Sequence, residues 1–150
     1  MISIRKIELP IPGLERLRSE ARDEGYNFIE TLVEQWANAQ NRFDAPGEAL
    51  CGGLDDGLLV AVGGLNVDPF AGRPDMGRIR RVYVRQAWRN KGVGRALVTA
   101  LVDEARAHFR WVRLRAENAE AARLYQRLGF VPISSPEATH IMVLDETPVP

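Results

Sequence analysis

A dense group of basic residues lies between positions 78 and 95. Seven of these eighteen residues are Arg or Lys and none is acidic, although the whole chain has twenty basic and twenty acidic side chains. The stretch ends in RNKGVGR, residues 89–95, where three cations and two glycines precede an apolar segment with helical periodicity. A local concentration of one charge attracts a ligand of the opposite charge. The chemistry that these residues predict is therefore the binding of an anion such as a diphosphate.

The place of this segment at the start of a helix indicates how it would hold the anion. The first N–H groups of a helix have no partner within the helix and lie at the positive end of its dipole, so they can bind phosphate oxygens. Gly92 and Gly94 let a ligand approach the backbone closely because they have no Cβ atom. The spacing differs from that of the P-loop, and it is not the Rossmann Gly-x-Gly-x-x-Gly because position 97 is Leu97.

A second block of residues follows some twenty positions later. Residues 118–130, NAEAARLYQRLGF, have the pattern Asn-x-x-Ala-x-x-Leu-Tyr-x-x-x-Gly-Phe. Together with Arg89-x-x-Gly92-x-Gly94, this block resembles the two signatures of the GNAT superfamily of acyl-CoA-dependent N-acyltransferases. The blocks have the family's order and separation, and the predicted order of elements extends the resemblance along the whole chain.

The resemblance implies that the anionic ligand is acetyl-CoA, the donor substrate. The main chain of Val82 and Val84 would pair with the pantetheine arm as if the arm were another strand, which requires the strand to separate locally from its neighbour. Asn118 would bind the pantetheine or cap the following helix, two compatible roles. The pyrophosphate would be bound within the basic turn, by Arg89, Asn90, Lys91, Gly92, Val93, Gly94 and Arg95.

The resemblance also assigns a proton donor. In this family an amine attacks the thioester directly, a backbone N–H such as that of Val84 stabilises the oxyanion, and a tyrosine at the place of Tyr125 protonates the departing thiolate. The alternative is that Tyr125 simply packs in the helix core, but the frame of Asn118 and Gly129-Phe130 around it favours the acid role.

The general base is unassigned. Many family members place a glutamate where this chain has Arg78. Either the amine arrives neutral, or a base comes from another segment, for which Glu48, Asp75 and Glu117 are candidates.

The arginines of the preceding strand have two interpretations. Alternation places Arg78 and Arg80 on one face of the strand and Arg81 on the other. A guanidinium in the acceptor pocket would suit a substrate with a carboxylate or phosphate. A solvent-exposed charged face explains the same residues, and this second interpretation is the favoured one.

The elements that must position these residues alternate between strand and helix patterns. We predict strands over 2–9, 48–54, 58–65, 78–84, 111–116 and 139–144, and helices over 14–24, 28–36, 92–109 and 119–128. Turn residues predict loops over 40–47 and 66–77. The fold class is therefore α/β (α+β), with a single mixed, mostly antiparallel central sheet flanked by helices, and residues 1–150 are expected to form a single GNAT-like N-acetyltransferase domain.

Composition narrows the function classes. Equal numbers of acidic and basic side chains argue against nucleic-acid binding, and no apolar run fits a signal peptide or a membrane span. Cys51 is the one cysteine, so no intramolecular disulfide can form, and we expect it to be a buried hydrophobe. His108 and His140 belong to no ligand cluster, so no metal is expected. A cytoplasmic protein follows, and the family makes homodimerisation plausible.

Three functions are consistent with these residues. The leading one is an enzyme that transfers an acetyl group from acetyl-CoA to a primary amine of a small molecule, a peptide or a protein. The second is a catalytically degenerate acyl-CoA-binding sensor or interaction module, which the absent carboxylate at Arg78 favours. The third is a nucleotide-binding or kinase-like protein, which lacks the pattern of Mg²⁺ ligands.

Overall fold

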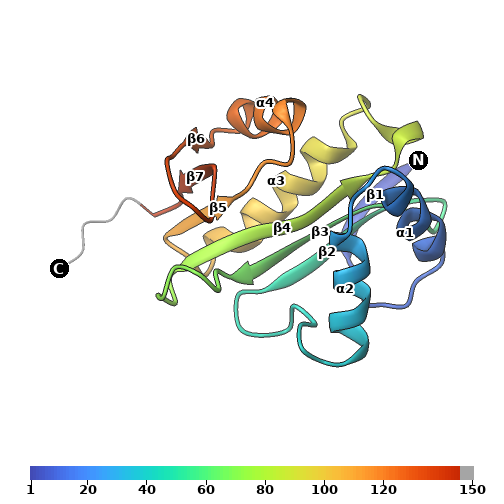
Figure 1. The fold of residues 1–150 in the computed structure, drawn as a ribbon, viewed down its shortest axis with the longest axis horizontal. Helices are drawn as coiled ribbons and strands as arrows, with labels where there is room; N and C mark the ends of the chain where they lie inside the picture. Colours follow the sequence, from blue (N-terminus) through green and yellow to red (C-terminus); the bar gives the residue numbers. More distant parts are fainter. Residues whose placement is uncertain (146–150) are drawn as a thin grey trace.

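The computed structural model describes residues 1–145. Within them a seven-stranded sheet has the strand order β1-β2-β3-β4-β5-β7-β6 (Figure 1). The strands are β1 (Ile2–Lys6), β2 (Ala49–Asp55), β3 (Leu58–Val67), β4 (Met76–Val84), β5 (Trp111–Leu114), β6 (Val131–Pro132) and β7 (His140–Val143). Neighbouring strands are antiparallel except β4 and β5, which are parallel. The mixed, mostly antiparallel sheet predicted from the sequence is confirmed.

Four α-helices and one 3-10 helix accompany the sheet within residues 1–145. They are α1 (Leu14–Asp23), α2 (Phe28–Ala37), the 3-10 helix η1 (Gln86–Trp88), α3 (Val93–Arg106) and α4 (Ala119–Arg127). Figure 1 shows α1 and α2 close to β2 and β3, with α4, β6 and β7 gathered at the other end of the sheet.

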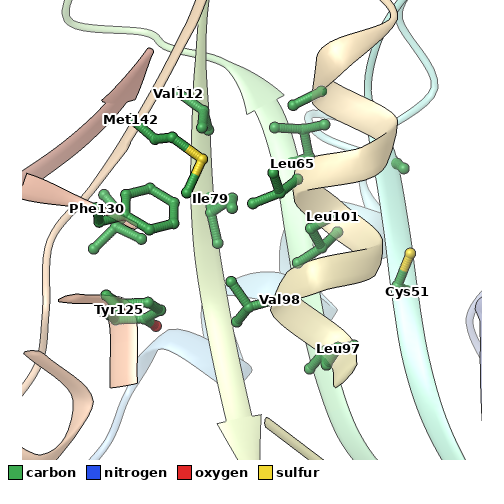
Figure 2. Packing of buried hydrophobic residues seen from close by; sticks show 14 of the residues in the cluster. Cys51, Leu65, Ile79, Leu97, Val98, Leu101, Val112, Tyr125, Phe130 and Met142 are labelled. Atoms are coloured by element: carbon green, nitrogen blue, oxygen red, sulfur yellow. The ribbon is translucent and has the colours of Figure 1, made fainter. Parts of the chain in front are cut away.

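The helices cover both faces of the sheet. Leu50 and Leu54 of β2 pack with α1 and α2, whereas Ala49 and Cys51 of the same strand pack with α3. Because successive side chains of a strand point to opposite faces, these two clusters lie on opposite sides of the sheet. Figure 2 shows the α3 cluster, which includes Tyr125 of α4. The architecture is therefore helix, sheet, helix.

The apolar stripe predicted for α3 is the part of the helix that is buried. Leu97, Val98 and Leu101 are fully buried and face the sheet in Figure 2. Burying an aliphatic side chain of this size stabilises the fold by about 1.5–3 kcal/mol. This packing holds the first turn of α3 beside the end of β4. The basic turn, residues 89–95, connects these two elements.

Strands β3 and β4 extend further than predicted. Both enter the loop predicted over residues 66–77, because Asn66 pairs with Arg78 and Val67 with Gly77 in the antiparallel ladder. The N–H of Asp68 also donates to the carbonyl of Met76 at 2.8 Å. Hairpin pairing has therefore overridden the local turn preference at both ends of this loop.

Candidate functional site

Strands β4 and β5 separate after the third residue of β4. They pair from Met76–Trp111 to Arg78–Arg113, after which β5 ends at Leu114 while β4 continues to Val84. The β5-facing side of β4 beyond Arg78 has no paired strand in the described sheet. Unpaired backbone groups of this kind can bind an extended ligand as an added strand. The separation required by the sequence interpretation is present.

A β-bulge follows in β4, three residues beyond the last pair with β5. Val62 pairs with Tyr83 and Gly64 with Arg80, so Gly63 lies opposite two residues, Arg81 and Val82. Arg81 has a positive φ of 60°, a conformation that costs a non-glycine residue about 1–3 kcal/mol. A bulge interrupts the alternation of side chains and re-aims those next to it.

The backbone of Val82 and Val84 faces the gap. The N–H of Arg85 donates to the carbonyl of Val60 in β3 at 2.9 Å. Because the backbone groups of successive residues point to opposite sides of a strand, those of Val84 and Val82 point away from β3. The carbonyl of Val84 accepts a bond from Nε of Arg89 at 2.9 Å. At Val84 the group left for a ligand is therefore the N–H.

The basic turn presents a row of free amides. Gly92 caps α3 in the left-handed conformation with φ of 83°, and a Cβ atom added there would meet nothing within 4 Å. No acceptor within residues 1–145 receives the N–H groups of residues 90–95, and the first to bond is that of Ala96, to the carbonyl of Gly92 at 3.0 Å. The first turn of α3 contains no acidic residue. This arrangement fits a diphosphate.

The cations of the turn do not all face this site. Arg89 pairs with Glu24 of the α1–α2 loop, Nη1 to Oε2 at 2.9 Å, and its guanidinium lowers the pKa of that carboxyl. Lys91 is exposed and lies outside the cavity lining, and the side chain of Val93 is buried in the core, so only their backbone could contribute. Arg95 lines the cavity, as does Arg127, a cation that the sequence motif did not indicate.

A cavity of about 340 Å³ joins these features. It runs from the start of α3 along the free side of β4 to α4. Its lining includes most of the residues predicted to bind the cofactor: Val82, Val84, Arg89, Asn90, Gly92, Gly94, Arg95 and Asn118.

Asn118 caps α4 and reaches across the cavity. Its Oδ1 accepts the N–H of Ala121 at 2.8 Å, as expected for an N-cap. Its Nδ2 donates to the hydroxyl of Tyr26 at 3.3 Å, a contact between residues 92 positions apart. The capping role is confirmed, and a ligand role remains a prediction.

Tyr125 lies where the cavity meets the core. It is 6% exposed, and its ring packs edge-on against Phe130 with centroids 5.8 Å apart. Figure 2 shows the ring between α4 and β4. Burial raises the pKa of its hydroxyl, and the charge of Glu117 raises it further. A phenol of this kind stays protonated at neutral pH and can donate a proton.

A second cavity, of about 210 Å³, adjoins the first and shares Phe28, Val82, Glu117 and Tyr125 with it. Of the three candidate bases, Glu117 is the one that lines both cavities. Glu48 instead accepts bonds from Nδ2 of Asn66 and the N–H of Val67, and Asp75 pairs with Arg73.

Arg78 is not part of an exposed charged face, so the favoured sequence interpretation is wrong for this residue. It is 7% exposed and bonds to Asp68, Nη1 to Oδ2 at 3.4 Å, and to the carbonyl of Glu137 at 2.6 Å. Asp68 also accepts Nε of Arg113 at 2.6 Å. Burial opposes ionisation of Asp68, but the bonds and charges of its partners outweigh burial and lower its pKa. Asp68 lies in a predicted loop and its partners lie in two predicted strands, so no local pattern indicated this buried network.

Three further expectations from the sequence concern Cys51, metal binding and membrane spans. Cys51 is 3% exposed, as predicted, and burial raises the pKa of its thiol to about 11. Within residues 1–145, no three His, Cys, Asp or Glu side chains are grouped so that they could hold a metal ion. None of the helices in this part of the chain is both long and apolar enough to span a membrane.

Comparison with known proteins gives consistent matches. The family model described as the acetyltransferase (GNAT) family matches residues 12–130. The chain is 42% identical over 52 residues to the L-methionine sulfoximine/L-methionine sulfone acetyltransferase of Salmonella typhimurium strain LT2, a match that covers 33% of this chain and only 30% of that protein.

Solved structures extend the likeness to nearly the whole chain. A protein of Exiguobacterium sp. 255-15 that is assigned as an acetyltransferase matches with a TM-score of 0.86 at 27% identity, over 95% of this chain and 93% of that one. The yncA protein of Salmonella typhimurium, solved with its cofactor acetyl-CoA, has a TM-score of 0.71 at 17% identity, over 100% of this chain and 98% of that one. At this identity the second match shows the shared fold.

Proposed function

Because this chain belongs to the acetyltransferase (GNAT) family, we propose that it transfers an acetyl group from acetyl-CoA to a primary amine. The observation that carries the proposal is the row of free amides at the start of α3, which continues into the unpaired side of β4 and ends at Tyr125. We also propose that residues 1–150 act as one catalytic domain.

The residues divide the binding of the donor between them. The N–H groups of residues 90–95 would hold the pyrophosphate, with Arg95 adding charge at the cavity wall. The main chain of Val82 and the N–H of Val84 would bind the pantetheine arm, and Asn118 lies close enough to the groove to contribute its amide. Acetyl-CoA, when bound, supplies a thioester carbonyl that an amine can attack.

Three groups of this chain would assist the attack. Glu117 lines both cavities and is placed to take a proton from the incoming ammonium. The N–H of Val84 would stabilise negative charge on the carbonyl oxygen. Tyr125 would donate its proton to the departing sulfur as negative charge develops there. Its hydroxyl is protonated at neutral pH, and burial raises its pKa and so makes it a weaker acid than an exposed tyrosine. A thiol with a pKa of about 8.5 leaves readily, so the acid supplies only part of the rate.

The direct test is release of free CoA thiol from acetyl-CoA. The panel contains amino acids, polyamines, aminoglycosides and peptides, and acetyl-CoA binding is measured in parallel by calorimetry. We expect binding in the absence of amine and thiol release with at least one amine class. Binding without release across the whole panel would instead support the acyl-CoA sensor, and tight ATP binding without acetyl-CoA binding would support a nucleotide-binding protein.

A further inference from the structure

The smaller cavity has an unusual concentration of positive charge. Four arginines line it, and the single carboxylate in its lining is that of Glu117. Phe28 and Phe70 form apolar parts of the wall. The four arginines are Arg78, Arg80, Arg81 and Arg115.

Two of the four arginines already have partners. Arg78 is bonded to Asp68 and to the carbonyl of Glu137, and its guanidinium lies 5.1 Å from the centre of the Phe70 ring. Arg115 donates to the carbonyl of Pro136. These contacts attach Arg78 and Arg115 to the wall of the cavity.

The side chains of the other two, Arg80 and Arg81, have no hydrogen bond or ion pair with any group in residues 1–145. Nε of Arg81 is buried and has no partner. The pKa of Arg80 is lowered to about 10, first by burial and then by the neighbouring charges of Arg81 and Arg78, which Asp68 and Glu48 oppose. Two adjacent, partly buried guanidinium groups destabilise each other unless an anion lies between or beside them.

The bulge in β4 lies where two consecutive arginines line the same cavity. Regular alternation would send the side chains of Arg80 and Arg81 to opposite faces, but the bulge, which places Arg81 and Val82 opposite Gly63, interrupts that alternation, and both residues line this cavity. Arg81 adopts a left-handed backbone conformation that glycine or asparagine would adopt with less strain. Strain of this kind at a cavity wall is typical of a functional position.

We propose that the acceptor is a small amine that carries an oxyanion, in the first place a carboxylate, and that Arg80 and Arg81 bind this anion. The inference rests on the proposed acetyl transfer, because it places the acceptor in the cavity that shares Tyr125 and Glu117 with the donor groove. The guanidinium fork binds a carboxylate through two parallel N–H···O bonds, which would satisfy the free donors.

Size and charge narrow the acceptor class further. A volume of about 210 Å³ is below the usual range for ligand pockets, which favours a compact molecule such as a free amino acid over a peptide. Polyamines and aminoglycosides carry several positive charges, and the unpaired guanidinium groups would repel them. An amine with a phosphonate or phosphate has the same binding chemistry as a carboxylate and is distinguished by experiment.

The test uses amines in matched pairs. Thiol release from acetyl-CoA is measured with amino acids, with their amides and decarboxylated amines, and with aminophosphonates, in the wild type and in Arg80→Gln and Arg81→Asn. Asparagine is chosen at position 81 because it tolerates a positive φ. We expect kcat/KM to be roughly ten- to a hundredfold higher for the anion-bearing member of a pair, the range of a charge-assisted hydrogen bond. Each variant should reduce that ratio several-fold while the Kd for acetyl-CoA stays unchanged.

Arg5→Gln is the matched control, because Arg5 is exposed on β1 and lies outside both cavities. It should retain the wild-type ratio. Equal or faster turnover of the neutral amines, or variants that keep the wild-type ratio, would overturn the inference while leaving acetyl transfer intact. If no amine is turned over, binding of the amino acids is measured in the presence of CoA. Binding that both variants lose would support the anion site and refute the enzyme. A preference for aminophosphonates would assign the oxyanion as phosphonate and still support the site.

Discussion

Replacing Gly94 with aspartate should strengthen the fold and weaken donor binding through the same electrostatics. Gly94 is the second residue of α3, and a Cβ atom there would lie 3.5 Å from Leu124 and from Val84, an ordinary contact. The carboxylate would therefore fit and would lie at the positive end of the helix dipole. Aspartate has only slightly higher intrinsic helix propensity than glycine, but an acidic residue in the first turn stabilises a helix by about 0.3–1 kcal/mol. The free energy of unfolding should therefore rise by up to about 1 kcal/mol, which corresponds to up to about 2–4 °C in Tm.

The same carboxylate would repel the pyrophosphate. Two unit charges about 4 Å apart interact with about 1 kcal/mol in water and about 4 kcal/mol near a protein surface. Against a doubly charged diphosphate the loss is at least about 2 kcal/mol, so the Kd for acetyl-CoA should rise by roughly thirtyfold or more. Isothermal titration calorimetry measures the Kd, and urea denaturation measures the free energy of unfolding.

Gly94→Asn separates charge from volume, because asparagine and aspartate have the same shape. The asparagine variant should bind acetyl-CoA much more tightly than the aspartate variant, and added salt should reduce the difference. Wild-type affinity in Gly94→Asp would refute the placement of the pyrophosphate at the start of α3. Equal weakening in both variants would refute the electrostatic argument.

Three further outcomes follow from individual side chains. Tyr125→Phe should lower kcat by about a hundredfold with the KM for acetyl-CoA within twofold, and an unchanged kcat across pH 6 to 9 would remove the acid role. Asp68→Asn should lower the free energy of unfolding, measured in urea, by about 3–5 kcal/mol, because Arg78 and Arg113 lose their buried counter-charge. Because the pKa of Asp68 is lowered in the folded protein, its contribution to the free energy of unfolding is lost as pH falls, and the difference between wild type and variant should shrink in acid. Because the pKa of Cys51 is raised in the folded protein, its thiol contributes fully to the free energy of unfolding below about pH 9, and up to about 2 kcal/mol of that contribution is lost as pH rises toward 11. In the same urea assay, Cys51→Ala should lose less stability at alkaline pH than the wild type.

The sequence alone determined those parts of the site that depend on neighbours along the chain. The start of α3 follows from glycine at its N-cap and an apolar stripe after it, and the cap of α4 follows from Asn118 and the N–H three residues later. Helix ends expose the same amides in every protein, so the free amides of residues 90–95, the proposed anion site, could be predicted without a fold. The apolar periods likewise predicted each strand named from the sequence and each α-helix to within a few residues.

The tertiary structure alone decided what surrounds those local features. The pairing of β4 with both β3 and β5 creates the bulge at Arg81 and the gap after Arg78, and it brings Arg80 and Arg81 into one cavity although alternation predicted opposite faces. Contacts between distant residues place Glu117, and neither Glu48 nor Asp75, in the lining of both cavities, and they pair Arg89 with Glu24. These outcomes depend on strand register and on long-range packing, neither of which has a signal in a short stretch of sequence. The basic turn is thus a property of the chain, whereas the smaller cavity, the proposed acceptor pocket, is a property of the fold.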